Sequence, residues 1–182
     1  TSVIPIAGDH ITNDIAMALR TPTREAEDIK CKYGCALSQL ADVNENLDVA
    51  GVDDRPSRKL SRRALADVIQ PRVEELYELI QNELRRAGFE EVLSSGIVLT
   101  GGASVMPGMV ELGEEIFHMP VRLGNPKYTG SLADVVQNPR FSTSFGLLLE
   151  AQAQRKRGQK IQEKQGIKDV FGSMKQWFAK NF

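Results

Sequence analysis

The sequence predicts an α/β domain in which helices pack against a short sheet. Two observations indicate this class. Short apolar strand segments alternate with longer helical patterns, and one strand segment, residues 97–100, runs directly into a pair of glycines that precede a helix. The chain has 182 residues, 41% of them apolar and 26% charged. This composition is ordinary for a globular protein, and the length suffices for one domain with appendages.

Two helices are predicted in the first 34 residues. Residues 3–6 are expected to end a strand, and Ala7-Gly8-Asp9 to form the turn that caps the first helix. Pro22 then opens a second helix, which carries acids in its first turn and ends near Gly34. The apolar residues expected on one face of the first helix are Ile11, Ile15, Ala18 and Leu19.

A long apolar stripe predicts a helix in the middle of the chain. Ser61 is its expected N-cap, Gly88 closes it, and Pro71 is expected to kink it or to begin a new helix within it. The preceding residues 36–60 are mixed and polar and give only weak strand signals. The stripe consists of residues at steps of three and four: Leu65, Ile69, Val73, Leu76, Ile80, Leu84 and Ala87.

Strand and helix patterns alternate again after residue 95. A buried strand over 96–100 is followed by a helix from Pro107 to Phe117 and a brief strand over 121–123. Residues 124–140 are expected to be loop with a short helix at most, and a last body helix begins near Ser142. Met109, Leu112 and Ile116 are expected to face inward from the first of these helices, and the last helix includes Phe145, Leu148 and Leu149.

The cysteines and the ends of the chain bear on the cellular context. Cys31 and Cys35 lie one helical turn apart with no second pair and no nearby His, so no zinc site is expected and both are predicted to be reduced, helix-borne residues of a cytosolic protein. No segment has the roughly 20 apolar residues of a spanning helix, and no secretory signal opens the chain. Because the first residue is Thr1, in an apolar segment, we expect a fragment or a processed product.

The segment IVLTGGAS, residues 97–104, is the first candidate binding motif. Glycines at the end of a strand permit positive φ and let the backbone approach a flat ligand or a phosphate closely. Strand–glycine–helix junctions also occur without a ligand, and that alternative stays open. The second candidate is Glu27 with Lys30, one turn apart on a helix, for which an ion pair on a solvated face is the alternative.

The last sixteen residues, 167–182, differ in composition from the segment before them. Residues 151–166 hold one large apolar residue and predict a linker, with nascent helix as an open alternative. At about 100° per residue, by contrast, the apolar side chains of 167–182 share one arc of a helix. Lys175 flanks that arc. This pattern favours an interfacial membrane helix over a helix docked on the body. The apolar residues are Ile167, Val170, Phe171, Met174, Trp177, Phe178 and Phe182.

The charge is divided unevenly along the chain. Residues 151–182 carry eight Lys or Arg and two acids, which gives this segment a formal charge of +6. Since the whole chain has a net charge of −1, the other 150 residues together carry −7. A basic tail on an acidic body indicates an anionic partner, either a membrane or a nucleic acid. Because a nucleic-acid arm does not need the apolar stripe, we expect an anionic phospholipid membrane and no nucleic acid, with a basic-tailed nucleic-acid-binding adaptor as an alternative.

Taken in order, three segments resemble the C-terminal half of an actin-like ATPase, and the similarity narrows to the FtsA family of bacterial cell division proteins. They are VIPIAGDHITNDIAMALRTPTREAEDIKCKYG, RPSRKLSRRALADVIQPRVEEL and GIVLTGGASVMPGM. The resemblance implies the C-terminal lobe of an actin-like (ribonuclease H-like) ATPase fold with a small inserted α+β subdomain and a C-terminal amphipathic helix. The implied parts are a nucleotide-binding lobe (1–37 and 89–150), the inserted subdomain (38–88), a flexible linker (151–166) and a membrane-targeting helix (167–182).

The same resemblance implies half of a nucleotide site. Gly101, Gly102 and Ala103 correspond to the adenine and ribose side, and Glu27 and Lys30 to the acid and base that contact the ribose. The cofactor implied for the full-length protein is ATP with Mg²⁺, with at most weak ATPase activity. The family's phosphate loops lie outside this chain, so the chain alone is expected to bind ATP poorly, and no complete catalytic constellation is visible.

The implied function is to tether FtsZ filaments to the cytoplasmic face of the bacterial cell membrane at the division site. The implied partners are the C-terminal peptide of FtsZ, further copies of the protein in actin-like filaments, and other divisome proteins. An actin-superfamily kinase is the enzyme alternative, but it would need an acceptor site and a catalytic carboxylate. The residues expected to bind FtsZ are Arg58, Lys59, Arg62, Arg63, Arg72 and Glu75, with Arg72 the foremost candidate.

Overall fold

A computed structural model describes residues 1–51, 56–90, 92–93 and 95–157 of the chain. The expected amphipathic helix over 167–182 and most of the expected linker therefore lie outside the described residues. The described chain falls into two units, Thr1–Thr143 and the residues from Ser144 onward, and each is considered separately.

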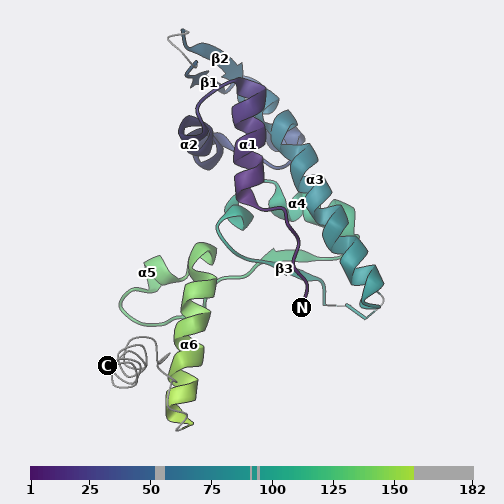
Figure 1. Cartoon of the computed structure of the whole chain (residues 1–182), viewed down its shortest axis with the longest axis vertical. Coiled ribbons are helices and arrows are strands. Elements are labelled where there is room, and N and C mark those ends of the chain that lie inside the picture. Colours follow the sequence, from purple (N-terminus) through teal and green to yellow (C-terminus); the bar gives the residue numbers. More distant parts are fainter. Residues whose placement is uncertain (52–55, 91, 94, 158–182) are drawn as a thin grey trace, which may run out of the picture. The chain divides into compact units, whose positions relative to one another are not determined.

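Helices make up most of the described chain (Figure 1). Short 3₁₀ turns connect several of them. The α-helices are α1 (Gly8–Leu19), α2 (Thr23–Tyr33), α3 (Arg62–Arg86), α4 (Met109–Phe117), α5 (Ala133–Val136) and α6 (Ser142–Lys156). The 3₁₀ helices are η1 (Ser38–Leu40), η2 (Ala103–Val105) and η3 (Pro139–Phe141).

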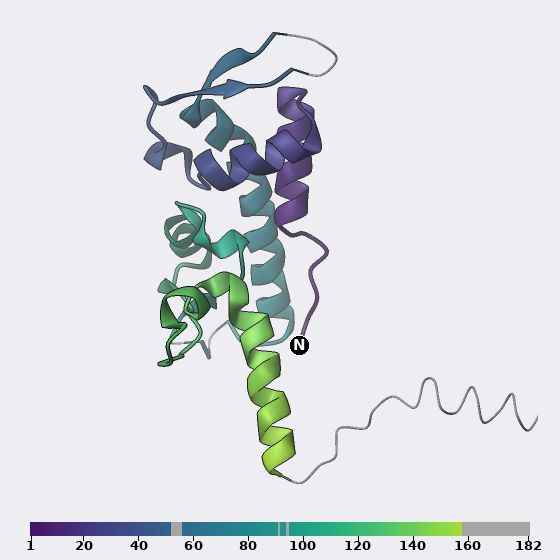
Figure 2. The same ribbon diagram turned by 90° about the vertical axis from the view of Figure 1, so that its left-hand side faces the viewer.

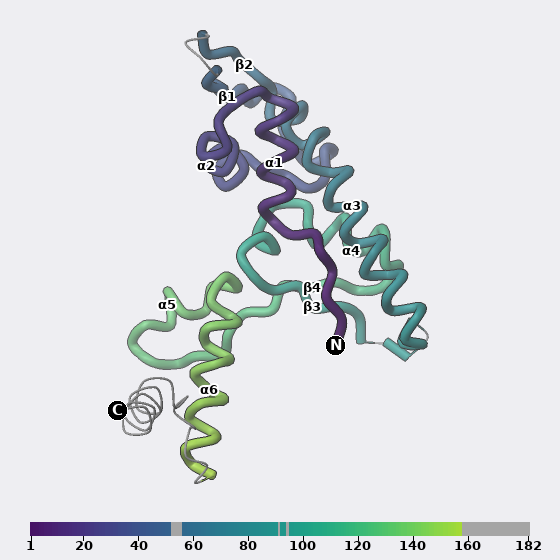
Figure 3. Tube along the Cα trace, viewed as in Figure 1, coloured from purple at the N-terminus to yellow at the C-terminus, as the bar shows by residue number. Residues whose placement is uncertain are grey.

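The strands form two small two-stranded sheets. β1 (Asn46–Val49) pairs antiparallel with β2 (Arg58–Ser61), in the region where the sequence carries only weak strand signals. β3 (Ile97–Leu99) pairs parallel with β4 (Val121–Leu123), with Ile97 opposite Val121, and α4 forms the crossover between them. Figure 3 shows β3 and β4 side by side next to α4. The expected α/β class is confirmed.

Both predicted N-terminal helices are present. α1 begins after Ala7, whose N–H donates to Nδ1 of His10 at 3.3 Å, so Gly8 and Asp9, expected in the capping turn, already belong to the helix. α2 begins after Pro22 and is capped by Gly34, as expected. Residues 3–6 are not a strand: Pro5 offers no N–H, and no described strand pairs with this segment. Ala18, expected on the inner face of α1, is exposed, because the buried face is centred on Ile15 and extends to Thr12, which leaves Ala18 beyond its opposite edge.

α3 is one continuous helix across Pro71, so the prediction that a new helix begins there is wrong. Only one backbone hydrogen bond is lost at a proline, and the apolar contacts on either side retain the helix. Ser61 caps it as predicted, accepting from the N–H of Ala64 at 3.2 Å. Of the predicted stripe, Leu76, Ile80 and Leu84 are only half-buried and Ala87 is exposed, whereas Tyr77, absent from the stripe, is fully buried.

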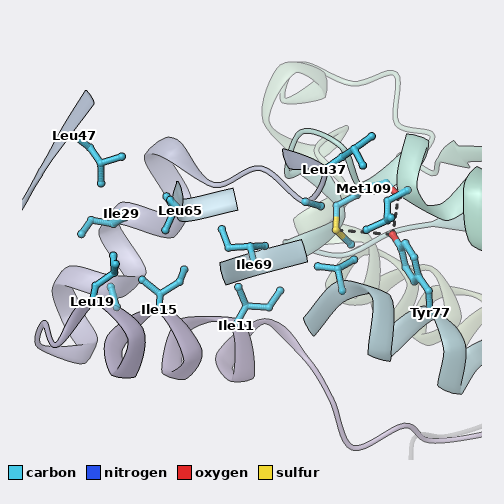
Figure 4. Close-up of a cluster of buried hydrophobic side chains, with 14 of the residues drawn as sticks. Ile11, Ile15, Leu19, Ile29, Leu37, Leu47, Leu65, Ile69, Tyr77 and Met109 are labelled. Atoms are coloured by element: carbon cyan, nitrogen blue, oxygen red, sulfur yellow. Dashed lines mark hydrogen bonds between the residues drawn. The ribbon is translucent and has the colours of Figure 1, made fainter. Parts of the chain in front are cut away.

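The core lies along α3 (Figure 4). Its first half packs against α1, and Tyr77 in its second half contacts α4, where its ring lies 5.0 Å from that of Phe117. The Tyr77 hydroxyl donates to the carbonyl oxygen of Met109 at 2.8 Å, and burial raises the pKa of this phenol. The fully buried large side chains are Ile15, Leu47, Val49, Leu65, Ile69, Val73, Tyr77 and Leu112.

The strand β3 is less buried than its apolar sequence suggests. Val98 is 48% exposed, while Ile97 and Leu99 on the other face pack against the core. The physical reason is that the sheet has only two described strands and one covered face. Ile116 of α4 is half-buried, whereas Met109 and Leu112 are buried as predicted.

The helix α6 begins at Ser142 as predicted but continues to Lys156, so residues 151–156 of the expected linker are helical. It has no buried residues, and both Leu148 and Leu149 are exposed. Among the described residues, none of the helices is both long enough and apolar enough to cross a membrane.

The packing on α3 generates a stability prediction. Leu65→Ala should lower the free energy of unfolding by about 2–5 kcal/mol, because Leu65 is fully buried and the truncation leaves a cavity. Leu40→Ala makes the same chemical change at a side chain that is 52% exposed, and should change it by less than about 0.5 kcal/mol. Urea denaturation of the intact protein measures both; equal losses would contradict the assigned core.

Candidate functional site

Two sets of predicted site residues lie on neighbouring elements of the first unit. Glu27 and Lys30 occur on α2, which packs against α1, and the glycines of the 97–104 motif precede η2. The start of α1 lies between them. A Cβ built on Gly8 would be 3.6 Å from Nζ of Lys30 and 3.7 Å from Cβ of Ala103. The structure therefore brings together the two motifs that the sequence analysis placed at one nucleotide site.

The ammonium group of Lys30 is buried, with the side chain 9% exposed. Its Nζ lies 2.6 Å from Oε2 of Glu27, 2.7 Å from Oγ1 of Thr12 and 3.1 Å from the carbonyl oxygen of Gly8. A lysine ammonium has three N–H donors, and these three acceptors use all of them. Lys30 therefore holds Gly8, Thr12 and Glu27 in place. It could donate directly to a ligand only if one of these bonds were released.

Thr12 is a site residue that the sequence analysis missed. It is 3% exposed on α1, accepts from Lys30, and its own single proton can be donated either to Oε2 of Glu27 or to the carbonyl oxygen of Gly8. The only signal for Thr12 in the sequence is its position, one turn from Ile15 on the buried face of α1. An apolar residue would be ordinary there, so a hydroxyl at that position indicates a polar partner. Thr12 connects α1 to the Glu27–Lys30 pair.

Glu27 is the member of the cluster that faces solvent, with its side chain 46% exposed. Partial burial acts to raise the pKa of Glu27, but hydrogen bonds from Lys30, Thr12 and Cys31 outweigh it, and the pKa lies below its ordinary value of 4.5. An ionised carboxylate with one exposed edge can accept hydrogen bonds from the hydroxyls of a ligand.

The glycine loop gives an open approach to the backbone. Gly101 has φ of +97°, a conformation that favours glycine, and a Cβ built on it would meet no atom within 4 Å. The loop is held in place by bonds from Ser104 Oγ to the carbonyl oxygen of Gly101 at 2.7 Å and from the Gly101 N–H to Pro139 at 3.2 Å. Gly102 and Ala103 are exposed, and a Cβ built on Gly102 would lie 3.9 Å from the Cβ of Arg140.

The basic residues predicted to bind FtsZ divide into two groups. Arg58 donates to the carbonyl oxygen of Leu19 at 2.7 Å, and Arg62 contacts the Tyr33 carbonyl and Glu45. By contrast, Lys59 and Arg63 are exposed, and within the part of the chain that the structure describes neither side chain makes a hydrogen bond or an ion pair.

Arg72 joins α3 to α1. Its Nε lies 2.5 Å from Oδ2 of Asp14 and one terminal nitrogen 3.0 Å from Oδ1, a two-point bond, while the other terminal nitrogen donates to Glu75. The hydrogen bond to Asp14 is the main reason that the pKa of Arg72 is raised, and Glu75 adds to the effect. Asp14 was not predicted, because nothing in its local sequence marks it.

The two cysteines are both free. Cys31 is exposed on α2, where burial and the neighbouring Glu27 raise the pKa of its thiol. Cys35 is buried but lies after the end of α2, so the prediction that both are helix-borne holds only for Cys31, because Gly34 ends the helix. The described residues contain no group of three or more His, Cys, Asp or Glu that could hold a metal ion.

Solved structures of bacterial MreB proteins share this fold. MreB 5 of Spiroplasma citri bound to AMPPNP has a TM-score of 0.59 at 20% identity, over 81% of this chain and 47% of that chain. MreB5 of the same organism bound to ADP gives a TM-score of 0.56 at 18% identity, with the same coverage. The fold is therefore that of the actin-like proteins to which MreB belongs.

Comparisons of sequence identify the family. The family model for cell division protein FtsA matches residues 1–146, and the chain belongs to the FtsA family. The cell division protein FtsA of Pseudomonas aeruginosa is 62% identical over 82% of this chain, that of Neisseria meningitidis 43% over 100%, and that of Escherichia coli K12 39% over 100%. The chain spans 36%, 45% and 46% of the length of these three relatives.

The lowered pKa of Glu27 predicts an effect of pH on stability. The ionised form favours folding, so its contribution is fully present above pH 4.5 and is lost as the pH falls through the lower folded value. Glu27→Gln should therefore reduce the difference in thermal midpoint between pH 6 and an acidic buffer near pH 3.5. Glu25→Gln alters an exposed acid of the same helix and should leave that difference unchanged. Equal pH dependence in wild type and Glu27→Gln would contradict the assignment.

Proposed function

We propose that this protein tethers FtsZ filaments to the cytoplasmic face of the bacterial cell membrane at the division site. The observation that carries the proposal is the match of the FtsA family model to residues 1–146, which assigns the chain to a family of cell division proteins. The amphipathic pattern over 167–182 and the exposed basic residues of the β2–α3 region supply the two ends of the tether.

The membrane end is the apolar arc of residues 167–182, which lies outside the described residues. Seven large apolar side chains on one arc, with Lys175 at its edge, suit the boundary between lipid headgroups and acyl chains. Each lysine near an anionic leaflet adds about 1 kcal/mol to the free energy of membrane binding, so one short helix attaches only reversibly. Self-association into actin-like filaments would place many such helices on one polymer and strengthen attachment through avidity.

The FtsZ end is proposed to be the inserted subdomain, residues 38–88. Lys59 and Arg63 have no described partners and can form charge-assisted hydrogen bonds with the acidic positions and terminal carboxylate of the FtsZ C-terminal peptide. Arg58 and Arg62 are held by contacts within the chain, and their part is to support this surface. Arg72 and Glu75 form its third part on α3.

The nucleotide site is proposed to take ATP in the full-length protein, with this chain contributing the adenine and ribose side. The open backbone at Gly101 and the exposed edge of Glu27 fit a purine and ribose hydroxyls, while Lys30 and Thr12 position Glu27. Mg²⁺ commonly binds through the phosphates of such a nucleotide, and it would do so here in the full-length protein. Contacts to the phosphates are proposed to come from parts of the full-length protein outside this chain, and other divisome proteins are expected as further partners.

Two alternatives have less support. An actin-superfamily kinase needs a catalytic carboxylate beside an acceptor site, and in the described residues Glu27 is the only acid of the Lys30 cluster and is placed to accept from hydroxyls. A nucleic-acid-binding adaptor would use the charge of the tail but leaves its apolar arc without a role.

The membrane end can be tested with vesicles. Trp177→Glu should weaken binding to anionic phosphatidylglycerol vesicles about tenfold or more, since it removes a large apolar side chain from the interface and adds a repelled charge. Gln176→Glu adds the same charge outside the apolar arc and should have a much smaller effect. Sedimentation of the intact protein with vesicles measures both. Unchanged binding of Trp177→Glu would overturn the membrane end, and full competition by duplex DNA at physiological salt would favour the adaptor.

The FtsZ end can be tested with a labelled peptide. Replacing Lys59 and Arg63 together with Ala should lower the affinity for the FtsZ C-terminal peptide about tenfold, because two charge-assisted contacts are lost. Arg24→Ala removes an exposed arginine from α2 and serves as the control. Fluorescence anisotropy measures the affinity; an equal effect of both variants would contradict the proposed surface.

A further inference from the structure

The Asp14–Arg72–Glu75 cluster joins α1 and α3 at the surface proposed to dock an acidic peptide. We propose that Asp14 acts as an internal competitor: its carboxylate occupies the position on Arg72 that a carboxylate of the incoming peptide would take, so that docking requires Arg72 to exchange one acid for another. The inference rests on the proposed docking function and concerns the regulation of that same site.

The geometry of the guanidinium supports this competition. Asp14 takes the side of the fork formed by Nε and one terminal nitrogen, at 2.5 and 3.0 Å, and Glu75 takes the other terminal nitrogen. This two-point bond is the strongest arrangement that an arginine offers a carboxylate. A peptide carboxylate that seeks the same bond must therefore displace Asp14.

The charges lead to the same conclusion. One arginine between two acids gives the cluster a net charge of −1, so an approaching carboxylate is repelled until one of the acids withdraws. The side chains of Arg72 and Asp14 are 27% and 20% exposed, so both remain within reach of solvent and the exchange needs no opening of the core. Glu75 is 51% exposed and lies on the same helix as Arg72, whereas Asp14 comes from a separate helix.

Asp14 also stands apart from the other acids near this surface. Glu45 is paired with Arg62, and Asp9, on the same helix as Asp14, is exposed without a described partner. Among the described residues, Asp14 is the only acid that forms a two-point bond with Arg72. Replacing Asp14 therefore leaves these two Arg72 nitrogens available and removes none of the basic residues proposed to contact the peptide.

The test compares two acid-to-amide changes on one helix. Asp14→Asn should raise the affinity of the intact protein for the FtsZ C-terminal peptide about two- to fivefold, the range expected when a partly exposed ion pair is removed. Asp9→Asn should leave the affinity unchanged. Anisotropy of the labelled peptide gives the affinities, and the thermal midpoint confirms that each variant is folded; Asp14→Ser is the substitute should the Asn variant not fold.

The Arg72→Ala background separates the two proposals. In that background Asp14→Asn should no longer change the affinity, because the contested group is gone. If Arg72→Ala and the Lys59/Arg63 double variant both bind the peptide as wild type does, the docking surface itself is wrong. If Arg72→Ala weakens binding while Asp14→Asn leaves it unchanged or also weakens it, docking stands and the competitor role of Asp14 is overturned.

Discussion

The first unit depends on the burial of one face of α3. Leu65 and Ile69 are fully buried where α3 meets α1, and Tyr77 reaches α4 through its ring and its hydrogen bond to the Met109 carbonyl (Figure 4). Figure 2 shows α1 and α2 beside the first half of this helix. Because α3 packs against both halves of the unit, its buried apolar face determines how α1 lies against α2. The position of the candidate nucleotide cluster therefore depends on this apolar packing and not on the polar contacts themselves.

The helix α1 contributes a residue to each of two polar clusters, one around Lys30 and one around Arg72. Thr12 faces α2 and satisfies the buried ammonium of Lys30, whereas Asp14, two residues later, faces α3 and holds Arg72. A buried ammonium must have all its donors paired, which makes Lys30 an internal organiser and leaves Glu27 as the outward group. The arginine cluster is more exposed than Lys30, as the proposed exchange of a peptide carboxylate for Asp14 would require.

The chain thus combines an actin-like fold with residues of contrasting chemistry. The chain belongs to the FtsA family of cell division proteins. In the proposed tether, a basic docking surface binds the filament and an amphipathic tail binds the membrane. This separation has a physical basis, since peptide recognition needs rigidly placed charges on packed helices, while membrane attachment needs only an apolar arc and nearby lysines.

Local patterns in the sequence were sufficient for the helices, the Ser61 cap, the β3–glycine junction and the pairing of Glu27 with Lys30, because each depends on residues a few positions apart. Tertiary contacts were needed for the rest. Thr12 and Asp14 meet partners on other helices, 18 and 58 residues away, and Pro71 stays within α3 because packing on both sides outweighs its local cost. No sequence period records such distant partners, so only the folded chain shows which charges are bound and which remain free.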